Sequence, residues 1–130
     1  MTRLPDWEQR LADYLADVLN TPHRFGSHDC AIHGANAVLA QTGHDYAAAY
    51  RGRYTTELGA ARALRKHGAG SLQATFDAQL PVINPALAQR GDLVMAQEAI
   101  GVCVGGHAMF AGTEGLERIA RAEWSRAWKV

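Results

Sequence analysis

The sequence predicts an α+β domain in which N-terminal helices pack on a small C-terminal antiparallel sheet. Up to about residue 80, apolar residues recur at steps of three and four, the period of an amphipathic helix. After Gln89 the chain changes to short runs of β-forming residues, and Gly105-Gly106 separates two of them as a tight hairpin turn would. Helices followed by strands give an α+β order, and 130 residues without repeat or linker predict a single domain over residues 1–130.

The first helix is expected over about residues 6–19. Asp6 is placed to cap its start, and Thr21-Pro22 is expected to stop it. Its apolar face is formed by Leu4, Trp7, Leu11, Leu15 and Val18.

A second, alanine-rich helix is expected over residues 31–40, and its small side chains suit close packing. Ser27 or Asp29 is the expected N-cap, and Gly43 the expected stop. Two further helices are expected over residues 56–67 and 71–79.

Regular structure is expected to break at Pro81 and Pro85, before the strands begin. Trp124, Trp128 and Val130 close the chain and are expected to pack back onto the body. The spacing of the two tryptophans fits one helical turn or one face of a strand. The strands are expected over residues 92–96, 99–104 and 107–111, with a further one over 116–119.

The composition gives no support to several kinds of partner, and leaves open only nucleic-acid binding through a small local patch. Thirteen Lys and Arg balance thirteen Asp and Glu, so no field of one sign would attract nucleic acid or an anionic membrane. No apolar run approaches the ~18 residues of a membrane span, and no basic, apolar leader marks a signal peptide. We therefore expect synthesis in a reducing cytoplasm, with Cys30 and Cys103 as free thiols.

Cys30 stands at the expected first turn of the alanine-rich helix. Backbone N–H groups and the positive end of the helix dipole favour thiolate there, and thiolate is the nucleophilic form. The position therefore suits the nucleophile of a cysteine peptidase. From spacing alone, the more common alternative is a small buried cysteine that fills helix packing. Cys103, within an apolar strand, is expected to be buried and inert.

Three segments carry a family resemblance. Residues 25–31 read FGSHDCA, residues 90–94 read RGDLV, and residues 99–105 read AIGVCVG. In this order they resemble the nucleophile segment, the first strand and the second strand of the NlpC/P60-type papain-like cysteine peptidases. Residues 42–45, 51–54 and 126–130 resemble, more narrowly, a short phage and prophage branch. The resemblance implies a papain-like fold with Cys30 at the nucleophile position.

The chain departs from this family at the general base. The family's histidine begins the second strand, where this chain has Ala99. The third, histidine-orienting position falls near Phe110 or Ala111, and neither can orient an imidazole. Loss of proton transfer typically removes ~10²–10⁴-fold in rate.

Three other histidines are candidates for the base. His107 begins the third strand and ranks first, His28 lies two residues before Cys30 and ranks second, and His33 lies one helical turn after it and ranks third. For each one, a surface or satisfied core histidine is the alternative interpretation. The remaining histidines, His23, His44 and His67, are expected in loops and at helix ends.

A metal site is the other interpretation of the same residues. His28, Cys30 and His33 are three ligand types within six residues, but zinc sites require four ligands with a recognisable second pair. Cys103 and His107 form a distant pair that a short strand pair seldom directs to one point. We therefore predict no metal and no cofactor.

Two functions of different class follow from the resemblance. In the first, the chain is a phage or prophage tail-tip or tail-assembly protein that docks on other tail-tip proteins and has weak or absent peptidase activity. In the second, it is an active cysteine peptidase: Cys30 attacks a peptidoglycan stem peptide, a histidine transfers the proton, and backbone N–H groups hold the oxyanion. Both place it in the virion tail after synthesis in the host cytoplasm. Ala99 favours the first.

Overall fold

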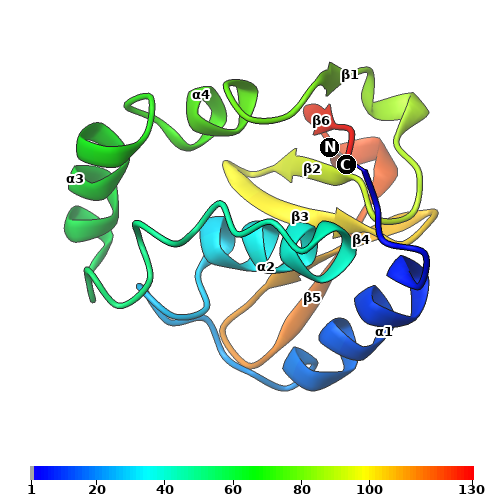
Figure 1. Ribbon diagram of the computed structural model, residues 1–130, viewed down its shortest axis with the longest axis horizontal. Coiled ribbons are helices and arrows are strands. Elements are labelled where there is room, and N and C mark those ends of the chain that lie inside the picture. Colours follow the sequence, from blue (N-terminus) through cyan, green and yellow to red (C-terminus); the bar gives the residue numbers. More distant parts are fainter. Residues whose placement is uncertain (1) are drawn as a thin grey trace.

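A computed structural model describes residues 2–130 as an α+β fold, which confirms the predicted class (Figure 1). Its helices are α1 (Trp7–Val18), α2 (Cys30–Thr42), α3 (Glu57–His67) and α4 (Leu72–Asp77), with short 3₁₀ turns at Pro85–Leu87 and Arg121–Glu123. Its strands are β1 (Val82–Ile83), β2 (Leu93–Ala96), β3 (Ala99–Cys103), β4 (His107–Ala111), β5 (Leu116–Ala120) and β6 (Arg126–Trp128). None of the helices in this described part combines the length and apolarity that a bilayer crossing requires.

The strands form one antiparallel sheet in the order β1-β6-β2-β3-β4-β5. The C-terminal strand β6 lies between β1 and β2, where Trp128 is opposite Val82 on one side and Leu93 on the other. The expectation that Pro81 and Pro85 exclude regular structure was wrong, because two residues between them pair with β6.

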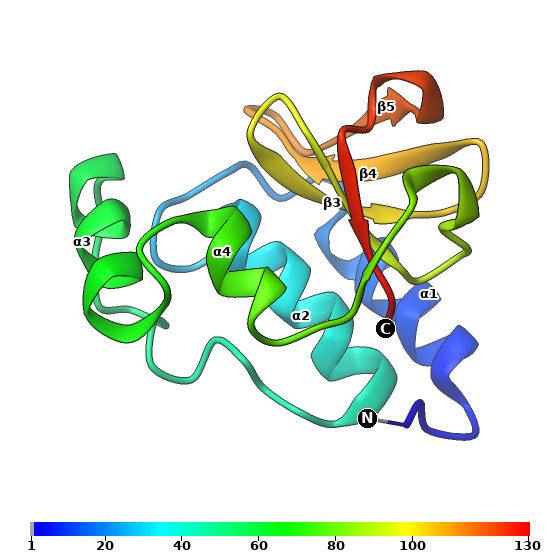
Figure 2. The ribbon, with the colours of Figure 1, turned by 90° about the horizontal axis from the view of Figure 1, so that it is seen from above.

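Alternation along the strands buries both faces of the sheet. Leu93 and Met95 pack in the cluster that contains the α2 residues Ala37 and Val38, and α2 lies across that face in Figure 2. Val94 and its neighbours on the other face pack against Ala88 and Trp124. Trp128 is fully buried in the first cluster and Trp124 in the second. Both tryptophans pack on the body as predicted, but on opposite faces, so neither expected arrangement of the pair occurs.

The helix ends show which capping residues act. Asp29, one of the two candidates for α2, accepts a hydrogen bond from the Ile32 N–H at 2.9 Å, and Gly43 ends the helix with φ +77°. Asp6 precedes α1 but makes no side-chain cap bond, so that expectation was wrong. At α3, Thr56 accepts from the Gly59 N–H at 3.0 Å.

The two hairpin turns next to β3 are of different kinds. Gly105-Gly106 forms the predicted tight turn, in which the Val104 N–H donates to the His107 carbonyl at 3.0 Å. The β2–β3 turn has no glycine, although Gln97 and Glu98 adopt φ of +52° and +62°. Such values suit a two-residue hairpin, but side chains other than glycine and asparagine seldom adopt them.

Candidate active site around Cys30

Cys30 is the first residue of α2, and its side chain is partly accessible. It packs at the edge of the cluster that contains Ile100 of β3, and the backbone N–H of Ile100 lowers the pKa of its thiol. Ala99 is the first residue of that strand. The structure thus brings the expected nucleophile position to the start of the strand where the resemblance places the general base, and an alanine occupies that place.

The environment of the Cys30 thiol does not favour thiolate. Burial raises its pKa above the ordinary value, and the carboxylate of Asp29 adds to the rise. The N–H groups of Ile100, Ala31 and Cys30 itself act in the opposite direction, but they do not outweigh burial. The expectation that the helix start lowers the thiol pKa was therefore wrong, because partial burial dominates.

The carboxylate of Asp29 is engaged in holding the loop before α2. One oxygen caps the helix, and the other accepts from the Gly26 N–H at 3.0 Å and from the Tyr54 hydroxyl. Gly26 has φ +86°, and a Cβ there would collide with the Tyr54 carbonyl oxygen. All three residues are thus required by this loop, and Asp29 has a structural rather than a chemical role.

His33 is fully buried, and its ring reaches β4. Its Nε2–H donates to the Met109 carbonyl at 3.0 Å, so Nδ1 carries the lone pair and accepts from the Tyr14 hydroxyl at 2.6 Å. Burial lowers the pKa of His33 to about 4, and nearby His28 adds to the fall. His33 therefore joins α1, α2 and β4 as a neutral imidazole whose ring nitrogens both have partners.

His28 is buried beside His33, with the two ring centroids 5.4 Å apart. Its Nε2 is a buried ring nitrogen without a hydrogen-bond partner among residues 2–130. Burial lowers the pKa of His28, and His23 lowers it further. In that part of the chain, no hydrogen bond joins His28 to the Cys30 sulfur. Its ring instead stacks edge-on with that of His33, the residue bonded to α1 and β4.

The strand register separates His107 from Cys30. Gly101, next to Ile100, pairs with Phe110, and His107 lies three residues further along β4 at the Gly105-Gly106 turn. At about 3.4 Å per residue, four positions place His107 roughly 13 Å along the sheet from Ile100. The structure therefore does not bring the first-ranked base candidate to the thiol.

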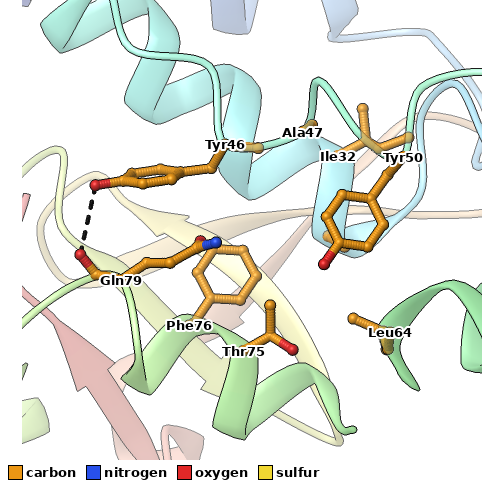
Figure 3. A pocket seen from close by; sticks show the side chains of 10 residues that line it. Ile32, Tyr46, Ala47, Tyr50, Leu64, Thr75, Phe76 and Gln79 are labelled. Carbon is orange, nitrogen blue, oxygen red and sulfur yellow. Dashed lines mark hydrogen bonds between the residues drawn. The ribbon is translucent and has the colours of Figure 1, made fainter. Parts of the chain in front are cut away.

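A small cavity lies between α2, α3 and α4, and Cys30 is not among the residues that line it (Figure 3). Its volume is about 20 Å³, close to that of one water molecule. The Tyr50 hydroxyl points into it between Thr75 and Leu64, and that buried oxygen has no partner among residues 2–130. The cavity is too small for a peptide side chain, so it is not a preformed substrate pocket.

Sequence reasoning missed the two tyrosines that hold these groups. Tyr14 binds the His33 ring and Tyr54 binds the Asp29 carboxylate, 19 and 25 residues away along the chain. No local pattern indicates such pairs. Within the described residues, no three metal-binding side chains converge, and both cysteines are free.

Comparison with known proteins places the chain in one family. Residues 2–130 match the model of the family described as Domain of unknown function (DUF6950), and the chain belongs to that family. Searches of the curated proteins and of the solved structures gave no match.

Proposed function

We propose that the chain is a papain-like domain of the NlpC/P60 type that acts as a phage or prophage tail-tip or tail-assembly protein, with weak or absent peptidase activity. The observation that supports this most is Ala99 at the start of β3, beside a Cys30 thiol whose pKa burial raises. Acyl transfer requires a base that removes the thiol proton and then donates it to the leaving group. Without that base, neither proton transfer is catalysed.

The positions of two other histidine candidates, His33 and His107, support the same proposal. His33 has partners on both ring nitrogens, and His107 lies at the Gly105-Gly106 end of the β3–β4 pair, away from Ala99. The tail setting is drawn from the resemblance of residues 42–45, 51–54 and 126–130 to the phage branch. A domain that keeps the fold without the chemistry is expected to contribute surfaces for assembly.

The alternative is an active peptidase of peptidoglycan stem peptides. The partly accessible sulfur of Cys30 at a helix start, with three backbone N–H groups acting on it, is the observation in its favour. Its general base would be His28, after a movement that brings the unpartnered Nε2 to the sulfur.

One assay separates the two. The purified chain is incubated with peptidoglycan sacculi, and released stem peptides are measured by liquid chromatography and mass spectrometry. We expect no release above that of the Cys30→Ser variant. Release by the native chain that Cys30→Ser abolishes would refute the proposal, and its loss in His28→Gln would identify the base. The Ala99→His variant tests whether the missing base alone limits the site.

The proposed setting has its own test. Mass spectrometry of purified virions from a strain that carries the gene should find the chain at a fixed ratio to the tail-tip proteins. Its absence from tails that assemble normally would refute the tail assignment without affecting the argument about Cys30.

A further inference from the structure

The outer face of α3 carries a hollow of about 530 Å³ lined by basic side chains. In Figures 1 and 2, α3 stands at one end of the molecule, away from the sheet. The hollow is lined by Arg53, Tyr54, Thr55, Thr56, Gly59, Arg62, Ala63, Lys66 and His67, and no acidic residue is among them.

The Arg and Lys side chains of this hollow make no stabilising polar contact within the described residues. No ion pair or hydrogen bond involves the side chains of Arg53, Arg62 or Lys66 within residues 2–130. Arg62 and Lys66 are one helical turn apart, a spacing at which like charges repel. The Asp45 carboxylate, by contrast, is paired with Arg51 at 3.0 Å. The chain thus neutralises the charge of Arg51 but leaves the positive charge of the hollow without a counter-charge in the described part of the chain.

The charge is local rather than general. Residues 53–67 contain four Lys or Arg and one Glu, a net charge of +3, and the other residues carry nine basic against twelve acidic side chains, a net charge of −3. Glu57, the acidic residue of α3, is separated from Arg62 by five helical positions and does not line the hollow. The positive end of the α3 dipole at Thr56 adds to the field.

An exposed apolar side chain borders the same face. Leu58 is 57% exposed and precedes Arg62 by one turn, so their side chains lie next to each other. Two aromatic rings line the hollow. Tyr54 is buried with its hydroxyl bonded to Asp29, and His67 packs edge-on against Tyr50, so the described residues of the hollow lack the row of exposed rings on which successive bases stack. This combination suits a peptide with acidic and apolar side chains better than a nucleic acid strand.

We infer that this hollow is a docking surface for an acidic segment of a partner protein, with Arg62 and Lys66 binding its carboxylates and Leu58 contacting an apolar residue next to them. Guanidinium and ammonium groups bind carboxylates through charge-assisted hydrogen bonds, and Gly59 to Lys66 spans about 10 Å of helix, enough for two successive acidic side chains on one side of an extended peptide. The inference rests on the proposed function only in taking the chain to be a docking protein.

The test uses a fluorescein-labelled peptide of sequence Glu-Leu-Glu-Glu-Leu-Glu, whose binding to the full chain is followed by fluorescence anisotropy. Matched variants are Arg62→Glu, in the hollow, and Arg65→Glu, on the same exposed helix but outside the lining. Both change the net charge by the same amount. We expect Arg62→Glu to weaken binding about tenfold or more, Lys66→Glu to behave alike, and Arg65→Glu to change it less than about twofold.

Two comparison ligands assign the partner class. A glutamine version of the peptide should bind much more weakly, and a labelled oligothymidylate of equal charge should bind less tightly than the acidic peptide. Equal loss in Arg62→Glu and Arg65→Glu, no binding of the peptide, or tighter binding of the oligothymidylate would each overturn the inference. Hydrolysis of sacculi that depends on Cys30 would instead refute the proposed function and leave these binding results intact.

Discussion

The start of α2 and the outer face of α3 both gather polar side chains, and they differ in what those side chains contact. Before and within α2, every polar atom of the Asp29 and His33 side chains has a partner, and Tyr14, Tyr54 and Met109 among these partners come from far along the chain. On α3, Arg62 and Lys66 have none among the described residues, and both are exposed. The polar side chains of Asp29 and His33 therefore hold the fold beside the candidate nucleophile, whereas the basic side chains of α3, a segment with no expected role, are free to bind a ligand.

Replacing Asp29 should have the largest effect on stability. Asp29→Ala removes the α2 cap, worth about 1 kcal/mol, and leaves the Gly26 N–H and the Tyr54 hydroxyl without an acceptor, at about 1–3 kcal/mol each. We expect urea denaturation to show a loss of about 4 kcal/mol. Arg62→Ala is the control and should change stability by less than about 0.5 kcal/mol. A similar small loss in both would remove the contrast between the two regions.

Gly26 and Gly52 form a second matched pair. Both have positive φ, +86° and +68°, but a Cβ at Gly26 would collide with the Tyr54 carbonyl, and one at Gly52 would meet no atom. We expect Gly26→Ala to cost about 3 kcal/mol, from strain and collision together, and Gly52→Ala about 1 kcal/mol, from strain alone. Thermal unfolding of the two variants measures the difference. Equal losses would mean that the loop before α2 adapts and is less fixed than its contacts imply.

The buried imidazole of His33 predicts acid sensitivity. Its folded pKa of about 4 lies below the ordinary value, so the unfolded chain binds the proton more tightly. The stability that neutral His33 contributes is therefore complete above pH ~6.5 and is lost as the pH falls towards 4, by about 1.4 kcal/mol per pH unit. Urea denaturation between pH 7.5 and pH 4.5 should show this decline, and NMR titration should show the His33 ring still neutral at pH 5.5. A ring that titrates near 6.5 would contradict the buried geometry.

The two cysteines should differ in reactivity because of exposure alone. Cys30 is partly accessible, whereas Cys103 is fully buried beside Arg121 and Ala88. Iodoacetamide should modify Cys30 first in the native chain, as mass spectrometry of peptides would show, and both at similar rates in urea. Faster modification of Cys103 would mean that the face of the sheet covered by Trp124 opens more readily than the α2 start.

The sequence was sufficient for the elements that local rules determine. Asp29 and Gly43 bound α2 because capping and left-handed φ are local requirements, and Gly105-Gly106 forms its turn for the same reason. β1 could not be predicted, because its two residues form a strand only by pairing with β6, which is distant in the sequence. The Gln97-Glu98 turn lacks the glycine by which such turns are recognised.

The candidate site was predictable only in part. The position of Cys30 at the start of α2 followed from the residues around it. The roles of the histidines did not, because they depend on register: a shift along β4 decides whether His107 meets the thiol, and only the packing of α1 on α2 gives His33 its tyrosine partner. The thiol pKa also depends on burial in the folded chain, and rules for helix starts take no account of such burial.

The central claim, that the Cys30 thiol has no proton acceptor, is tested most directly by the pH dependence of its alkylation. The rate of carboxamidomethylation at Cys30 is followed by mass spectrometry from pH 5 to pH 10. We expect a rate that rises steadily with pH and passes its midpoint above the ordinary thiol pKa of about 8.5. A rate that reaches a plateau below about pH 7, as a thiolate–imidazolium pair would give, would contradict it.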